Sequence, residues 1–136
     1  MHAFLNEKPG PPFLAMLALT IFLAWGCSKS SRAASDVSFV LASDLQPPRA
    51  GRNTFTVTLT SQAGQPVHGA RVSLEGDMSH PGMSPAFADA KEIAAGTYQA
   101  RLDLNMLGDW TIIAHIQLPD GRTFNRETKF QNLQPN

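Results

Sequence analysis

The stretch NTFTVTLT, residues 53–60, alternates apolar and hydroxyl side chains without a break. In an extended chain Phe55, Val57 and Leu59 fall on one face, and the threonines between them fall on the other. A period of two is typical of a β-strand with one face in a core and the other toward solvent. The stretch therefore predicts a half-buried strand.

The same alternation recurs on both sides of this strand, and it predicts five more. Segments rich in Gly, Pro, Asn and Asp separate the alternating stretches, as expected of turns. The side chains predicted to face the core are Val37, Phe39 and Leu41; Val72 and Leu74; Tyr98, Ala100, Leu102 and Leu104; Trp110, Ile112, Ala114, Ile116 and Leu118; and Phe124 and Phe130.

Residues 86–95, AFADAKEIAA, fit neither pattern well. Their composition suits a helix, but Phe87 and Ile93 do not share a helical face. We therefore expect an irregular strand and connection here. With this seventh strand, the spacing of about ten residues predicts an all-β fold, an immunoglobulin-like β-sandwich of about seven strands over residues 36–131.

The composition limits the classes of function. A length of 136 residues suggests a single domain. The 11 basic and 11 acidic residues balance, which argues against a nucleic-acid partner because phosphate binding needs a basic surface. The charged residues lie mostly at predicted outward positions or in turns, where they form a solvated surface.

The N-terminal part differs from the rest. Residues 13–25, FLAMLALTIFLAW, are apolar apart from Thr20, a run too short to span a bilayer comfortably. The only cysteine, Cys27, follows directly, and the segment resembles a bacterial lipoprotein signal. We expect a signal peptide over residues 1–26, lipidation at Cys27 and a flexible tether over residues 27–35. The alternatives are an uncleaved anchor or ordinary cleavage near residues 31–35.

Each of these outcomes places the domain outside the cytoplasm. We expect a cell-envelope location, with the chain held to a membrane by its lipid and facing the periplasm. No other cysteine is present, so the domain must be stabilised by its core without internal disulfides.

A group of methionine and histidine residues carries the candidate chemistry. Residues 75–85, EGDMSHPGMSP, contain Met78, His80 and Met83 around a Pro-Gly turn. Met78 continues one core-facing series and Met106 continues another, so both are predicted to point inward. If successive strands alternate in direction, both series end at the same end of the sandwich, where Trp110 begins the next strand.

Two interpretations of this group remain open. Cu(I) is a soft ion that accepts thioether sulfur and imidazole nitrogen, so Met78, His80, Met83 and Met106 are candidate copper ligands. Methionine is also a common core residue, and Met78 and Met106 would then only fill the end of the core. His80 and Met83 are harder to explain in that way because a turn does not require their burial. His68 and His115 are predicted to be ordinary surface histidines.

The pattern across residues 65–126 resembles the YtkA-like/FixH-like family of small extracytoplasmic domains. The matching features are Met78, Pro81-Gly82-Met83, Gly96-Thr97-Tyr98, Met106-Leu107-Gly108-Asp109-Trp110 and Pro119-Asp120-Gly121. The resemblance implies a membrane-anchored or lipoprotein β-sandwich, with a role in copper supply to cytochrome oxidase for some members. The chain departs from the FixH type because its signal resembles a lipobox instead of a full transmembrane helix.

Three functions follow as hypotheses. The first is a copper-binding or copper-handling lipoprotein module that works with a copper-handling or respiratory membrane protein. The second is a metal-free interaction or assembly module of a membrane complex. The third and weakest is an enzyme, because no Ser/His/Asp arrangement or nucleophilic cysteine stands out. Asp77 and Asp109 could lie near one another at the same end, but paired acids in turns are usually only solvated. We therefore expect a protein that is not an enzyme.

Overall fold

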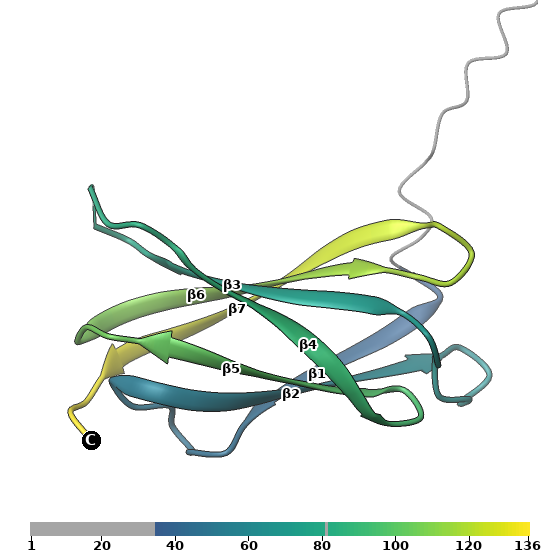
Figure 1. The fold of residues 1–136 in the computed structure, drawn as a ribbon, viewed down its shortest axis with the longest axis horizontal. Coiled ribbons are helices and arrows are strands. Elements are labelled where there is room, and N and C mark those ends of the chain that lie inside the picture. Colours follow the sequence, from purple (N-terminus) through teal and green to yellow (C-terminus); the bar gives the residue numbers. More distant parts are fainter. Residues whose placement is uncertain (1–34, 81) are drawn as a thin grey trace, which may run out of the picture.

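The computed structural model describes residues 35–80 and 82–136, and within them the chain folds into antiparallel strands (Figure 1). The strands are β1 (Val37–Ser43), β2 (Gly51–Ser61), β3 (Arg71–Met78), β4 (Ala86–Ala94), β5 (Thr97–Leu104), β6 (Gly108–Gln117) and β7 (Thr123–Leu133). The described residues contain no helix, and so none that is long and apolar enough to cross a membrane.

The alternating stretch that predicts a strand lies in β2. Phe55, Val57 and Leu59 are fully buried, and the threonines between them are half-buried on the opposite face. β2 pairs with β1 on one side and with β5 on the other. It is therefore an interior strand of its sheet, and hydroxyl side chains suit its outer face.

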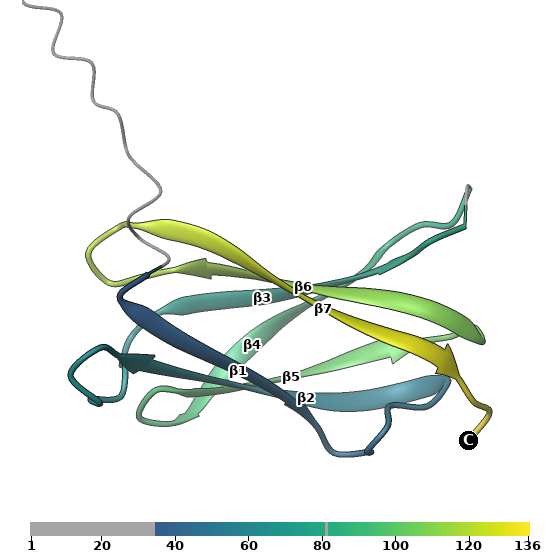
Figure 2. The same cartoon turned by 180° about the vertical axis from the view of Figure 1, so that it is seen from behind.

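The strands follow the order β1-β2-β5-β4-β3-β6-β7, and this order is folded into two layers (Figures 1 and 2). One layer contains β1, β2 and β5, and the other contains β3, β6 and β7. β4 belongs to both, because Ala86–Ala90 pair with β3 whereas Lys91–Ala94 pair with β5. The predicted β-sandwich is confirmed as an all-β architecture of seven strands, with β4 crossing between the layers.

The core lies between the two layers. Rings from opposite layers meet there, since the centroids of Phe55 on β2 and Phe130 on β7 are 6.0 Å apart. Every buried residue of this core lies between Val37 and Leu133, so a chain from Ser35 to Asn136 contains the whole of it. The buried apolar residues are Val37, Phe55, Val57, Leu59, Val72, Leu74, Met78, Tyr98, Ala100, Leu102, Leu104, Trp110, Ile112, Ala114, Ile116, Leu118, Phe124 and Leu133.

The predicted strands are confirmed, and the segment expected to form an irregular strand does so, with a register shift between Glu92 and Ala94. Residues 86–94 form β4, with the alanines facing the core and Phe87 and Ile93 facing outward. The domain extends slightly beyond the predicted end at residue 131, because β7 continues to Leu133. The predicted signal peptide, Cys27 and all of the predicted tether except Ser35 lie outside the described residues.

Candidate functional site

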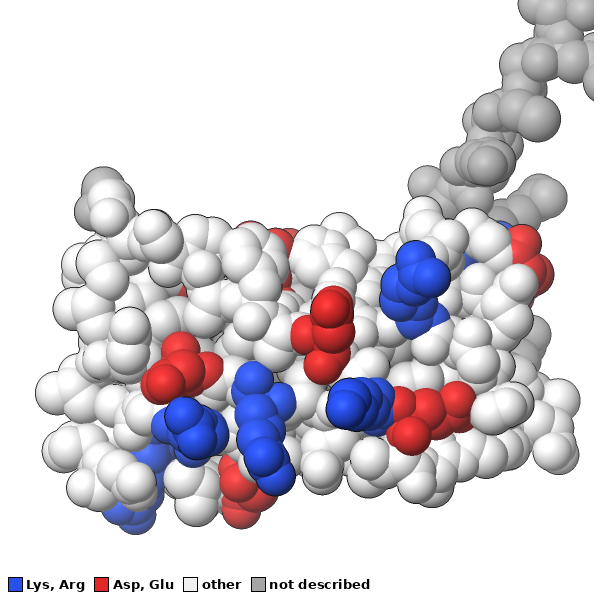
Figure 3. All heavy atoms as spheres, in the orientation of Figure 1, with Lys and Arg blue, Asp and Glu red and all other residues white. Residues whose placement is uncertain are grey.

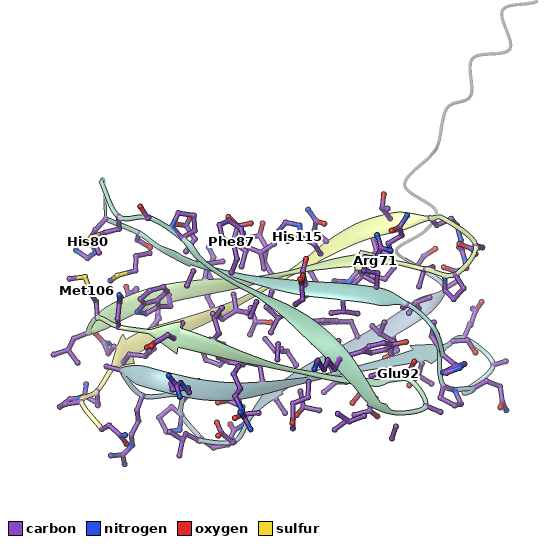
Figure 4. The ribbon with its side chains drawn as sticks, viewed as in Figure 1. Arg71, His80, Phe87, Glu92, Met106 and His115 are labelled. Carbon is purple, nitrogen blue, oxygen red and sulfur yellow. The ribbon has the colours of Figure 1, made fainter. Side chains whose placement is uncertain are left out.

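Two turns that are distant in sequence lie at the same end of the sandwich. β3 and β6 are paired so that Met78 lies opposite Trp110, which brings the turn after β3 beside the turn before β6. We call residues 78–80, 82–85 and 105–110 the Met/His end. Figure 4 shows His80 and Met106 at this end, each projecting from a different turn. The predicted meeting of the two turns is confirmed.

Trp110 fixes the turn between β5 and β6. Its ring is almost fully buried, and its Nε1 donates a hydrogen bond to the backbone oxygen of Met106, over 3.0 Å. A buried indole N–H needs such an acceptor, and a turn carbonyl needs a donor. This hydrogen bond satisfies both groups and holds the backbone of Met106 in place.

Met78 is a core residue, as its position in the strand predicts. It is 8% exposed, and the space above Gly108 is closed by its methyl group, which lies 3.6 Å from the position a Cβ would take there. A Cβ at position 108 would therefore make ordinary van der Waals contact with this methyl group. Met78 therefore packs beneath the turn that carries Met106.

The prediction that Met106 points inward is wrong. β5 ends at Leu104, and Met106 lies in the following turn with 43% of its surface exposed. The alternation of β5 does not continue past its last residue because the chain turns toward Gly108, which has a positive φ of 114°. The Met106 side chain therefore lies on the surface of the Met/His end.

His80 and Met83 are exposed as well, the latter at 36%. Together with Met106 they present one imidazole and two thioethers to solvent from two neighbouring turns. Leu107, for which the sequence predicts no role at the site, is 56% exposed in the same region. Leu107 interrupts no strand pattern, so only its exposure next to Met106 identifies it as part of this surface.

The other two described histidines already have partners elsewhere. His68 Nδ1 lies 2.8 Å from Glu92 Oε1 at the opposite end of the sandwich. His115 lies on the outer face of β6, 2.7 Å from a Glu75 oxygen and 3.1 Å from Asn125 Oδ1. Both are surface histidines in polar networks, in agreement with the prediction.

The acidic pair of the enzyme hypothesis lies on the outer face of β3 and β6, where both side chains are exposed. Asp77 lies opposite Thr111 in the pairing of β3 with β6. Asp109 accepts a hydrogen bond from the backbone N–H of Asn132 over 2.9 Å, which ties the end of β7 to β6. Asp109 also borders a small hollow of about 190 Å³ with Ser79, Thr111 and Lys129, and this hollow is mostly polar.

Among residues 35–80 and 82–136, no three His, Cys, Asp or Glu side chains lie close enough together to hold a metal ion. Such a set is what zinc or a hard cation would require. The exposed methionine and histidine side chains of the Met/His end offer thioether and imidazole donors, which suit a soft monovalent ion.

These features define a small β-sandwich domain whose two neighbouring turns expose methionine and histidine. A model of the YtkA-like family matches residues 31–115, which is more than half of the chain and includes the whole Met/His end. The chain belongs to the YtkA-like family. No curated protein matches it.

Proposed function

We propose that the chain is a membrane-tethered, extracytoplasmic module that binds Cu(I) through His80, Met83 and Met106 and has no enzymatic activity. One observation carries the proposal: three soft donors from two distant parts of the sequence are exposed together at one end of a rigid sandwich. Soft ligands of this kind favour Cu(I), and methionine binds without first losing a proton.

The position of the Met/His end supports a role in handing copper to a partner. Val37, where β1 begins, pairs with Ser61, whereas Gly51, at the other end of β2, pairs with Leu104 beside the Met/His end. The length of β2 therefore separates the start of the domain from the candidate ligands, a span of about 35 Å for a strand of this length. A lipid at Cys27 would leave the ligands facing away from the membrane.

A titration tests the copper site directly. The chain from Ser35 to Asn136 competes anaerobically for Cu(I) with a chromophoric chelator. We expect about one Cu(I) per chain, and an affinity at least tenfold lower after His80→Ala with Met83→Ala or after Met106→Ala. Absence of binding, or an affinity unchanged by these substitutions, would contradict the proposal.

Two control variants separate the exposed donors from other sulfur and nitrogen. Met78→Leu removes a buried sulfur with little change in volume, so we expect nearly unchanged affinity. His68→Gln removes an exposed imidazole at the far end, and we expect no change. A large loss of affinity in Met78→Leu would make Met78 a ligand and would mean that the turn opens on binding.

The lipid anchor is a separate part of the proposal. In cells of the native host, the full chain is expected in the membrane fraction with a mass increased by a lipid, and Cys27→Ala is expected to remove that added mass. An unmodified Cys27 in the mature protein would contradict lipidation and favour an uncleaved anchor, whereas a mature protein that begins near residues 31–35 and lacks Cys27 would favour ordinary cleavage.

The alternative is a metal-free interaction module. It is favoured by the apolar side chains exposed at the Met/His end, Met83, Met106 and Leu107, because neighbouring exposed apolar residues often mark a binding surface. The two functions differ in one respect. A partner that still copurifies with the chain after His80→Ala and Met83→Ala would support the alternative, whereas loss of the partner together with copper would support the first.

A further inference from the structure

Strand β4 has the reverse of the usual arrangement of side chains. Its inward residues are the small Ala86, Ala88 and Ala90, which pack against the core. Its outward residues include Phe87 and Ile93, which are 67% and 57% exposed. Strands of soluble domains normally bury their large apolar side chains and expose polar ones. An exposed aromatic flanking charged residues is typical of a protein interface.

The outward residues of β4 form a self-complementary series: Phe87, Asp89, Lys91 and Ile93. If two copies of β4 pack face to face and antiparallel, with the centre of symmetry at Ala90, Phe87 meets Ile93 of the second copy. In the same arrangement Asp89 meets Lys91 of the second copy. Both contacts occur twice, as a two-fold interface requires.

The charges of the series are available for such contacts. In the described part of the chain, neither Asp89 nor Lys91 takes part in an ion pair. Figure 3 views the molecule from the side on which β4 crosses, and basic and acidic side chains are interspersed there. A surface with both signs in alternation repels a second copy less than a surface of one sign does.

A hollow beside Ile93 gives the aromatic ring a place to enter. Where β4 leaves β5, the surface forms an open hollow of about 430 Å³, lined by Asp89, Lys91, Ile93, Gln99, Ala100 and Arg101. It exists because the pairing of β4 with β5 stops at Lys91 and Gln99. Ala100 gives it an apolar floor, and Arg101 at its side can lie over an aromatic ring.

We propose that this chain forms a two-fold symmetric dimer through the outer face of β4, in which Phe87 of each copy enters the hollow beside Ile93 of the other. The partner is a second copy of this chain because one surface supplies both sides of each contact. Phe87 fits the hollow beside Ile93, and Asp89 pairs with Lys91. Dimers of this symmetry are the commonest closed assemblies of soluble proteins. The Met/His end plays no part in this interface.

A charge-swap experiment tests the dimer. The chain from Ser35 to Asn136 is studied by sedimentation equilibrium over a range of concentrations. Asp89→Lys places two lysines opposite each other, and Lys91→Asp places two aspartates opposite each other, so each single variant is expected to be monomeric. The double variant restores both pairs and is expected to form dimers like the parent. A mixture of the two single variants is expected to form one-to-one dimers.

Phe87→Ala tests the aromatic contact. Both copies lose a ring, so we expect the dissociation constant to rise by about tenfold or more. Val40→Ala is the matched control, since Val40 is 56% exposed on β1, away from β4, and it should leave the dissociation constant unchanged. All variants should unfold as cooperatively as the parent.

Several results would overturn the proposal. One is a parent chain that stays monomeric at the highest concentration that can be studied. Another is a dimer that persists equally in the two single charge variants and in Phe87→Ala. A double charge variant that remains monomeric while folded would also contradict the proposed register.

Discussion

Asn53 is a fully buried polar residue, and its side chain organises the segment before β2. Its Oδ1 accepts a hydrogen bond from the N–H of Arg49, over 3.1 Å. Its Nδ2 donates to the oxygens of Arg49 and Gly51, over 2.7 Å and 2.9 Å. One amide thus satisfies three backbone groups at the point where the chain enters β2.

We expect Asn53→Ala to lower the free energy of unfolding by about 2–3 kcal/mol, because it leaves several backbone groups without partners. Urea denaturation of the chain from Ser35 to Asn136 measures the difference. Ser38→Ala, at an exposed position of β1, serves as the control and should change stability by less than about 0.5 kcal/mol. A loss as small as the control's would mean that water replaces the amide.

Glu92 joins three parts of the chain at the end opposite the Met/His end. Its carboxylate lies 2.8 Å from His68 Nδ1 and accepts hydrogen bonds from the N–H groups of Gly96 and Gly69. The hydrogen bond with His68, followed by those from the two backbone N–H groups, holds the pKa of Glu92 below its ordinary value of 4.5. The carboxylate is therefore favoured in the folded state.

This shift predicts acid sensitivity. Because the folded pKa is lower than the unfolded pKa, the contribution of Glu92 to stability is present above about pH 4.5 and is lost as the pH falls through the folded pKa. We expect Glu92→Gln to lower the Tm at neutral pH, and the gap to the parent to close in acid. Thermal melts from about pH 7 to pH 3 test this. Glu127→Gln, at an exposed position of β7, should show no such gap.

At the residue scale, the sequence predicts burial well inside strands and poorly past their ends. Met78 and Trp110 are buried as the alternation predicts, because both lie within paired strands. Met106 follows the same phase but is exposed, because β5 has already ended. A period of two has no meaning once the chain leaves the extended conformation, and Met106 lies within the predicted turn segment of residues 105–109, which follows Leu104.

At the element scale, β4 is the strand that sequence patterns describe least well. Strand patterns assume that large apolar side chains face the core. In β4 the side chains packed against the core are alanines. β4 also changes its pairing partner from β3 to β5, so it crosses between the two layers. The outward Phe87 and Ile93 therefore break the usual strand pattern. The change of partner within one strand depends on long-range pairing, which local alternation cannot show.

The turn between β4 and β5 depends on Gly96. Its φ is +71°, and a Cβ there would lie 2.8 Å from the oxygen of Leu59 and 2.8 Å from Cβ of Pro66. The oxygen of Gly96 also accepts a hydrogen bond from the N–H of Leu59. Glycine is therefore required both for its backbone conformation and for the close approach of the segment that follows β2.

Gly64 provides a matched comparison, with a φ of +78° and no atom within 4 Å of an added Cβ. We expect Gly64→Ala to cost about 1 kcal/mol for the left-handed conformation alone. Gly96→Ala should cost at least about 2 kcal/mol more, since backbone atoms must also move. Denaturant midpoints of the two variants measure the difference. Equal losses would mean that the residue 66 segment shifts freely and is not packed as described.

At the scale of the whole molecule, the two layers are joined through β4 and through the shared core. Pairing of β4 with β3 on one half and with β5 on the other makes one continuous set of hydrogen-bonded strands. The ring contact between Phe55 and Phe130 links the layers from inside. The apolar face of each layer is covered by the other layer. Neither layer is therefore expected to be stable alone.

One tryptophan and one tyrosine allow the unfolding of the two layers to be measured separately. In the chain from Ser35 to Asn136, Trp110 is the only tryptophan and lies on β6, while Tyr98 is the only tyrosine and lies on β5. Both are buried, so each reports on one layer. We expect tryptophan fluorescence and tyrosine absorbance to give the same urea midpoint, as a two-state transition requires. Separate midpoints would show that the layers unfold independently and that β4 does not couple them.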